Sequence, residues 1–236
     1  MLISKRLRYF LGHLGCSILL GLLLLALVFL VWYPAPFAHA VGVTHIFLML
    51  LAIDVTVGPL FSLLVYKEGK KTLKMDLAII ILLQVIALGY GVYALAQSRP
   101  AWVVQAGWLF EAVPANSIDS KDQQQAKAEY QRNSLFGPQW VAVDSAKNPQ
   151  NVLAAAQLMP STYTTVESQS ARIQQHAQTL EALQAFNAPN DIAVVLKQYP
   201  QAKKWMPLRT TGVGLVVLLN DKNQVLATVD LRPWQE

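Results

Sequence analysis

The stretch Ile53–Lys74, IDVTVGPLFSLLVYKEGKKTLK, decides the fold class, because it places a carboxylate inside an apolar run and ends that run in lysines. Asp54 lies in the run 41–65, where inserting an ionisable side chain costs about 2.5 kcal/mol or more. Gly58 and Pro59 predict that the helix kinks or loosens there, unless a neighbouring helix re-satisfies the freed carbonyl. We interpret Asp54, Gly58 and Pro59 as candidate packing or partner-helix positions.

Four lysines follow the apolar run and set the predicted topology: Lys67, Lys70, Lys71 and Lys74. Cytoplasmic loops of membrane proteins are enriched in Lys and Arg, so this end of the run is predicted to be cytoplasmic. The connector 33–40 has neither residue type and is predicted to lie on the outer side. The N-terminus, which carries Lys5, Arg6 and Arg8, is therefore expected inside.

Two further apolar runs complete a predicted membrane domain, residues 1–96, with spans at about 11–32, 41–65 and 77–96. Residues 97–236 are then expected to form a periplasmic α+β domain. The motif Ala38-His39-Ala40 has the form that a signal peptidase reads. The apolar run before it, 14–32, is longer than the ~7–15 residues of a typical signal, which favours a retained anchor and leaves cleavage open.

Composition excludes several function classes. The net charge of +5 comes mainly from the membrane part, with seven basic against three acidic residues, whereas the remainder has twelve against eleven. The basic balance therefore reflects topology, and no basic patch remains to indicate nucleic-acid binding. The single cysteine, Cys16, lies in the first apolar run and is interpreted as a packing residue.

Catalytic and ligand motifs were not found in the sequence. The four histidines, His13, His39, His45 and His176, do not have the spacing of a metal site, and neither a phosphate loop nor a nucleophile motif is present. A second carboxylate that would pair with Asp54 for intramembrane chemistry is also missing from the spans. We therefore predict a protein without metal, cofactor or enzymatic activity.

In the outer domain, we expect a strand over 101–113, a helix over 119–133 and a strand over 140–143. A capping box at 164–167 predicts a helix that continues to residue 187. Two β-branched runs, 212–219 and 224–231, predict a C-terminal β-hairpin. Together these elements predict a small antiparallel sheet with helices on one face.

Small residues recur four positions apart in the spans, at Gly12 with Cys16, Ser17 with Gly21 and Ala87 with Gly91. Such pairs let helix backbones approach closely, either within the three-helix bundle or against a transmembrane helix of a partner. Four polar residues on the second and third spans are candidates to satisfy Asp54 or to line a polar seam: Thr56, Ser62, Gln84 and Tyr90.

A series of motifs carries a family resemblance: Asp54, Gly58-Pro59-Leu60, Leu63-Leu64-Val65-Tyr66, Gly69-Lys70-Lys71, Leu73-Lys74, Asp76-Leu77, Tyr90-Gly91-Val92-Tyr93, Arg99-Pro100, Phe110-Glu111-Ala112-Val113 and Val229-Asp230-Leu231-Arg232-Pro233-Trp234. With these motifs the chain resembles the type IV pilin accessory proteins of the TfpX/TfpZ family. The match is specific over about residues 10–113 and only general over 114–205. It departs from the family at Glu68, where many members have proline, and at Trp108-Leu109.

The resemblance implies a chaperone-like accessory factor of the bacterial inner membrane, not an enzyme, that stabilises the cognate major pilin and promotes pilus assembly. Its implied partners are the lipid bilayer and the membrane helix and head domain of that pilin. Pilin helices carry a glutamate, and two like carboxylates repel, so direct contact with Asp54 is not expected. The alternative function is a membrane-anchored periplasmic sensor or ligand-binding module. The oligomeric state is left open.

Overall fold

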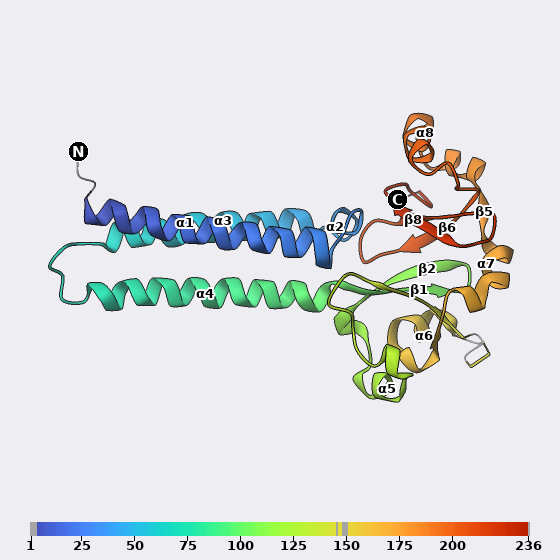
Figure 1. The fold of residues 1–236 in the computed structure, drawn as a ribbon, viewed down its shortest axis with the longest axis horizontal. Helices are drawn as coiled ribbons and strands as arrows, with labels where there is room; N and C mark the ends of the chain where they lie inside the picture. Colours follow the sequence, from blue (N-terminus) through green and yellow to red (C-terminus); the bar gives the residue numbers. More distant parts are fainter. Residues whose placement is uncertain (1–3, 145, 148–150, 236) are drawn as a thin grey trace. The chain divides into compact units, whose positions relative to one another are not determined.

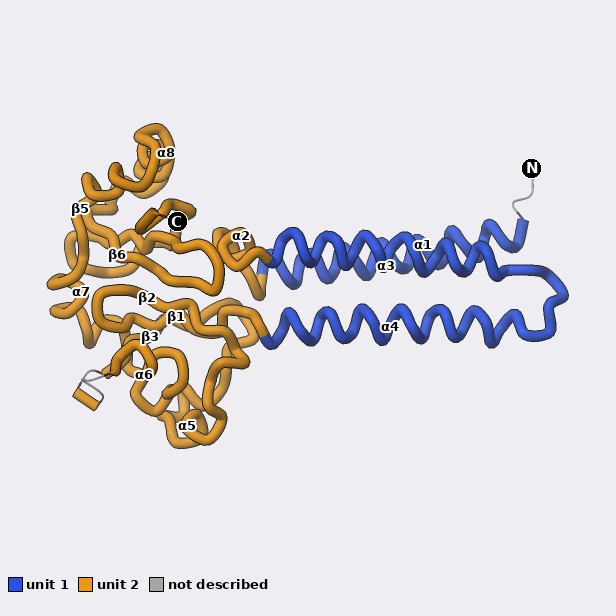
Figure 2. The backbone as a smooth tube through the Cα atoms, turned by 180° about the vertical axis from the view of Figure 1, so that it is seen from behind, with its two compact units in different colours: residues 1–30, 43–97 blue, residues 31–42, 98–236 orange. Residues whose placement is uncertain are grey.

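The computed structural model describes residues 4–144, 146–147 and 151–235 and divides the chain into two compact units (Figures 1 and 2). The first unit comprises residues 1–30 and 43–97, and the second comprises 31–42 and 98–236. The connector 31–42 therefore groups with the C-terminal part of the chain, although it lies between two apolar helices in the sequence.

Three long helices form the first unit: α1 (Lys5–Ala26), α3 (Val43–Val65) and α4 (Leu73–Ser98). A π-helical segment, η1 (Leu27–Trp32), continues α1. All three are long and apolar enough to cross a membrane, which confirms the three predicted spans. Their outward side chains are largely apolar and exposed, including Leu23, Leu64 and Leu83, as expected of helices solvated by hydrocarbon.

Helices α1 and α3 lie side by side in the first unit (Figure 1). Gly21 is buried at their contact, and a Cβ added to it would lie 3.5 Å from Cγ2 of Val55, an ordinary van der Waals distance. Near the N-terminal end of α1, Nε of Arg6 donates to the carbonyl of Leu63 near the C-terminal end of α3 (2.6 Å). The two helices therefore run antiparallel, and α3 continues through Pro59 to its end.

The described residues of the second unit form one eight-stranded mixed sheet in the order β4-β3-β1-β2-β6-β7-β8, with β5 also pairing with β6. The strands are β1 (Pro100–Ala106), β2 (Leu109–Pro114), β3 (Gln139–Val143), β4 (Tyr163–Thr164), β5 (Gln178–Thr179), β6 (Lys204–Arg209), β7 (Leu215–Leu219) and β8 (Val225–Val229). The helices are α2 (Phe37–Ala40), α5 (Ser120–Gln125), α6 (Val152–Leu158), α7 (Ser170–His176) and α8 (Pro189–Gln198). The second unit also contains short 3₁₀ helices: η2 (Ala115–Ser117), η3 (Ala128–Tyr130), η4 (Pro160–Thr162), η5 (Glu167–Gln169) and η6 (Leu180–Ala185).

Both faces of this sheet are buried. Because side chains alternate along a strand, Trp102 of β1 enters one apolar cluster with residues of α6, whereas Val103 enters another with residues of α2 and α7. At the β6–β8 end, Trp205 enters a third cluster beneath η6 and α8. Figure 1 shows α6 by the β1–β2 hairpin and α8 by β6 and β8. The α+β fold class and the C-terminal hairpin, β7 with β8, are confirmed.

Several finer predictions are wrong. The strand predicted over 101–113 is a hairpin, because Gly107 takes φ +63° and turns the chain between β1 and β2. The helix predicted over 119–133 is only α5 followed by η3. The helix predicted to follow the capping box is divided by β5, which pairs with β6. The sheet is mixed rather than antiparallel, since β1 pairs in parallel with β3 and β2 with β6.

The connector docks into the second unit through its own core and polar contacts. Phe37 and Ala40 of α2 belong to the central apolar cluster, and Tyr33, which is 1% exposed, shares a 3.1 Å hydrogen bond with Ser98. Burial raises the pKa of this tyrosine above its ordinary value. A Cβ on Gly212 would collide with the carbonyl of Ala40, so glycine permits this close approach.

Candidate functional site

A lateral groove of about 700 Å³ lies among the three helices of the first unit, and we call it the α1–α4 groove. Its lining comes from α1 (Lys5, Arg8, Tyr9, Gly12, His13, Cys16, Ser17, Leu20), from α4 (Ile81, Gln84, Val85, Leu88), and from Asp54 and Tyr66. Most of this surface is apolar. Polar groups are concentrated in two places, at the Lys5–Arg8 end and midway along the groove.

The polar groups midway along the groove form the His13 network, which comprises His13, Ser17, Asp54 and Gln84. The amide nitrogen of Gln84 donates to Oγ of Ser17 at 3.1 Å and to Oδ2 of Asp54 at 3.2 Å. It also lies 3.1 Å from the carbonyl oxygen of Asp54, so two hydrogens serve three acceptors. One side chain of α4 therefore joins all three helices.

Gly58 makes room for this arrangement. A Cβ at this position would collide with the side-chain amide of Gln84, so any larger residue would displace the amide. Pro59 is buried next to it within α3, and its carbonyl accepts a 2.7 Å hydrogen bond from Ser62. Gly58 thus has a packing role that explains the small residue in this helix.

The hydrogen bonds of Gln84 determine the tautomer of His13. Since the amide nitrogen is the donor to Ser17 and Asp54, its oxygen must be the acceptor of the 3.1 Å bond with Nε2 of His13. The neutral imidazole then carries its hydrogen on Nε2 and has a lone pair on Nδ1. Nδ1 is buried and has no hydrogen-bond partner among the described residues.

The Lys5–Arg8 end of the groove is basic. Lys5 pairs with Glu68 at 3.4 Å, and both side chains are more than half exposed. The rings of Tyr9 and Tyr66 pack together there, with centroids 5.6 Å apart. Arg8 forms no ion pair with any residue that the structure describes, so this end retains a positive charge.

The structure brings together two of the predicted packing residues, Asp54 and Gly58, around Gln84. Of the other polar candidates, Thr56 donates to Ala52 of its own helix and Tyr90 is 74% exposed. The four lysines lie elsewhere: Lys67, Lys70 and Lys71 in the α3–α4 loop and Lys74 in the first turn of α4. Lys70 pairs with Asp76 at 2.7 Å.

Sequence reasoning missed His13 as a site residue. Its spacing matches no metal motif, and the structure shows no group of three or more possible metal ligands among the described residues. The available signal was a histidine within an apolar span, one turn before Ser17 and next to the Gly12–Cys16 pair. That signal does not identify a partner 71 residues away in the sequence.

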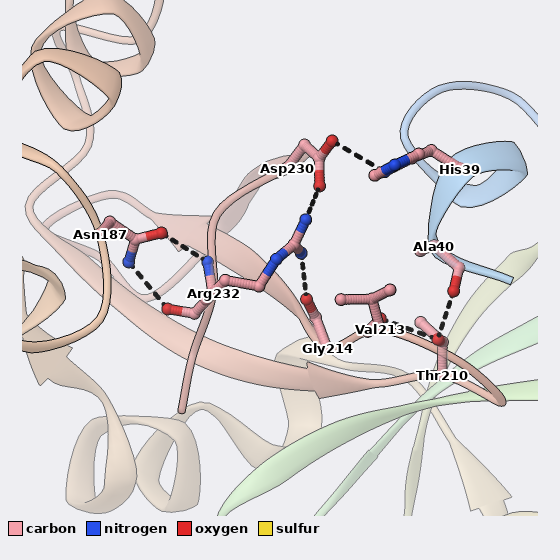
Figure 3. Close-up of polar contacts among 8 residues, drawn as sticks. All are labelled: His39, Ala40, Asn187, Thr210, Val213, Gly214, Asp230 and Arg232. Carbon is pink, nitrogen blue, oxygen red and sulfur yellow. Dashed lines mark hydrogen bonds and ion pairs between the residues drawn. The ribbon is translucent and has the colours of Figure 1, made fainter. Parts of the chain in front are cut away.

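A second polar cluster, the Arg232 network, lies in the second unit (Figure 3). Arg232 donates to Oδ1 of Asp230 and to the carbonyl of Gly214, both at 2.6 Å. Asn187 exchanges two hydrogen bonds with the backbone of Arg232, at 2.7 and 2.8 Å. His39 of α2 contacts the other oxygen of Asp230 at 3.1 Å. This network fastens the C-terminal segment and the connector to one domain.

Comparison with known proteins gives consistent matches. The profile of the family described as "Fimbrial assembly protein FimB" matches residues 2–42. "Fimbrial assembly protein, serogroup I" and "Fimbrial assembly protein, serogroup E1" of Dichelobacter nodosus are each 30% identical over 140 residues, which cover 58% of the chain and 54% of each relative. The protein of serogroups C1 and C2 is 34% identical over 94 residues, which cover 39% of the chain and 72% of that relative. The match therefore spans about half the length of the first two relatives, and no solved structure matches significantly.

Proposed function

This chain belongs to the fimbrial assembly protein family, and we propose that it is a membrane-bound assembly factor for type IV fimbriae. The similarity to the Dichelobacter nodosus proteins carries the proposal. Three membrane-spanning helices and a separate α+β domain suit a factor that meets fimbrial subunits before they leave the membrane. Such a role requires binding surfaces rather than a catalytic centre.

Within this family we assign the chain to the accessory type represented by TfpX/TfpZ. We propose that it stabilises the cognate major pilin by contacting both the membrane helix and the head domain of that subunit. Asp54, Gly58 and Pro59 would act as a packing core that maintains the shape of the α1–α4 groove. This assignment accounts for the motifs in α3 and the α3–α4 loop through which the sequence resembles these proteins.

The proposed location is the bacterial inner membrane, with residues 1–96 as the membrane domain and 97–236 as the periplasmic domain. Lys67, Lys70, Lys71 and Lys74 support this orientation through the positive-inside rule. Cysteine labelling tests it in a Cys16→Ser background. A cysteine replacing Lys222 should react with an impermeant maleimide once the outer membrane is opened, and one replacing Lys71 only after full lysis. The reverse pattern would refute the orientation.

Deleting the gene tests the proposed function. Fimbriae on the cell surface, the steady-state level of major pilin and twitching motility should all fall, and the wild-type gene supplied in trans should restore them. The control strain carries the same vector without the gene. Unchanged fimbriation in the deletion strain would refute an assembly role.

Co-purification tests the partner separately. A C-terminally tagged copy of the chain, extracted in mild detergent, should retain the major pilin of the same strain. An unrelated tagged inner-membrane protein of similar abundance serves as the control. Recovery of pilin at the control level would refute stable binding while leaving the assembly phenotype to be explained by another contact.

A further inference from the structure

We propose that the loop of residues 133–138 inserts Leu135 and Phe136 into the surface of the bilayer that α1 and α4 span. The ligand is the headgroup region of the lipid leaflet at which these two spans end. The inference rests on the membrane-spanning helices and is independent of the proposed role in fimbrial assembly. It follows from the exposure of two apolar side chains, from the hydrogen bonds that hold the loop, and from its contacts with the ends of the spans.

The loop exposes an unusual pair of apolar side chains. Among the large apolar residues in the described part of the second unit, Phe136 and Leu135 are the most exposed, at 84% and 64%. Single apolar residues scattered over a protein surface are ordinary. These two are adjacent in the sequence and lie on one loop, so they form a continuous apolar surface that water solvates poorly.

Hydrogen bonds hold this loop in one shape. The side-chain oxygen of Asn133 accepts from Nε1 of Trp102, a fully buried residue of β1, at 2.9 Å. The hydroxyl oxygen of Ser134 accepts from the backbone N–H of Phe136 at 3.0 Å, and Gly137 turns the chain with φ +73°. The apolar pair therefore lies in a turn that is fastened to the core of the domain.

The loop also contacts the residues that end two membrane spans. The first span ends at Trp32 and the third ends one residue before Arg99. Nη2 of Arg99 donates to the carbonyl of Ser134 at 2.9 Å, and the guanidinium carbon lies 5.9 Å from the ring centroid of Trp32. A Cβ added to Gly137 would lie 3.6 Å from the carbonyl oxygen of Val31. These contacts, all within the second unit (Figure 2), place the loop at the level where the spans leave the lipid.

The lipid surface suits the exposed pair chemically. Amphipathic aromatic rings gather at the ends of spanning helices, and leucine and phenylalanine side chains enter the boundary between headgroups and acyl chains. Trp32, at the end of the first span, follows this pattern. Two covalent span ends hold the leaflet next to the loop, so a protein partner would first have to exclude lipid from this position. The bilayer is therefore the occupant to which the geometry points.

Fluorescence quenching in vesicles tests the insertion. The full chain carries Cys16→Ser, which removes the native thiol, and Phe136→Cys labelled with a nitrobenzoxadiazole dye. It is reconstituted in vesicles of phosphatidylethanolamine and phosphatidylglycerol. The dye emission should shift to the blue, and a nitroxide at a shallow acyl position of the lipid should quench it. Iodide present on both sides of the membrane should fail to quench it.

Trp108→Cys in the same Cys16→Ser background is the matched control. Trp108 is an aromatic residue, 50% exposed, in the turn at the other end of β1, about 20 Å along the strand from Arg99. Its dye should be quenched by iodide and not by the lipid nitroxide. The same behaviour of the dye at position 136 would refute insertion. Protection at position 136 that required co-reconstituted major pilin would assign the loop to pilin and also overturn the proposal.

A charge next to the dye tests whether the apolar side chains drive insertion. Leu135→Asp, added to the labelled Phe136→Cys chain, should lower the ratio of inserted to water-exposed dye about tenfold, the effect of losing one buried leucine side chain. Val194→Asp is the control, since Val194 is 60% exposed on α8, outside the loop, and should leave the ratio unchanged. An unchanged ratio in the Leu135→Asp chain would contradict insertion of the apolar pair.

Discussion

The two polar networks use similar residues to different effect. Each contains a histidine, an aspartate and a side-chain amide. In the Arg232 network, hydrogen-bond partners are present for the side-chain oxygen and nitrogen of Asn187 and for both terminal nitrogens of Arg232. In the His13 network, Gln84 is fully engaged, but Nδ1 of His13 is buried without a partner among the described residues.

This difference separates a network whose named side-chain groups are paired from one that leaves a buried nitrogen unpaired among the described residues. A network whose groups are all satisfied stabilises one arrangement and gives a further ligand little to gain. A buried acceptor without a donor costs free energy, because it has lost its hydrogen bonds with water. The two networks therefore differ in whether their polar groups are paired among the described residues, and substitutions in each network test how much its contacts stabilise the fold.

Gly58→Leu should have the largest effect, because its side chain would displace the amide of Gln84 and break the hydrogen bonds of that amide to Ser17 and Asp54. We expect a loss of about 3 kcal/mol, the upper end for overpacking a close helix contact. Unfolding in mixed detergent micelles with increasing SDS, followed by circular dichroism, measures it. Gly89→Leu is the control, since nothing lies within 4 Å of a Cβ there. Similar losses of stability in both variants would show that the effect of Gly58→Leu does not come from the contact with Gln84.

Arg232→Ala should destabilise the second unit by about 2 kcal/mol, the typical contribution of hydrogen bonds to charged groups. The substitution removes the hydrogen bonds that Arg232 donates to Oδ1 of Asp230 and to the carbonyl of Gly214. Tryptophan fluorescence during thermal unfolding of the full chain in detergent reports the loss. The stability of Arg232→Lys should lie between those of the wild-type chain and Arg232→Ala, because an ammonium group keeps the charge but cannot reproduce the forked geometry of the guanidinium group. Equal losses of stability in the alanine and lysine variants would show that the forked geometry of the guanidinium group is unimportant.

Gln84→Leu should cost about 1–2 kcal/mol, because it removes interhelical bonds that average ~0.6 kcal/mol each in membrane proteins. The same substitution at Gln97 is the matched control on α4. Among the described residues, the side-chain amide of Gln97 donates to the hydroxyl of Tyr93, one turn earlier on the same helix. SDS-induced unfolding measures both variants. A loss at Gln97 as large as that at Gln84 would contradict the central position of Gln84 in the His13 network.

His39→Ala should have the smallest effect, no more than about 0.5 kcal/mol, because exposed ion pairs contribute little. The side chains of His39 and Asp230 are 67% and 43% exposed. Thermal unfolding at low and high salt measures the effect, with the exposed Thr211→Ala as reference. A loss above about 1 kcal/mol would show that His39 belongs to the stabilising part of the Arg232 network.

Local patterns were sufficient for some elements. The hairpin of β7 and β8 follows from two β-branched runs and a loop in which Oδ1 of Asn220 accepts from the backbone of Lys222 and Gln224. The turn between β1 and β2 also had a local signal, because Gly107 interrupts a run rich in β-branched and aromatic residues. The predicted strand over 101–113 ignored that glycine.

Other elements depended on distant pairing. Gln178 and Thr179 continue a helical pattern in the sequence, but they pair with Trp205 and Lys204 as β5. The parallel pairing of β2 with β6 joins Glu111 to Arg209 through a 2.7 Å ion pair, across 98 residues of sequence. Periodicity describes one segment at a time and carries no information about such partners.

The sequence by itself determined the three spanning helices, because the thickness of the hydrocarbon layer sets the length of an apolar run and the cost of burying charge limits what it contains. It also indicated that Asp54 needs a polar partner. Only the tertiary structure decided that Gln84 is that partner, that Gly58 makes room for it and that His13 retains a free acceptor. Hydrogen bonds between helices depend on their rotation and depth against one another, which packing fixes and which no single segment encodes.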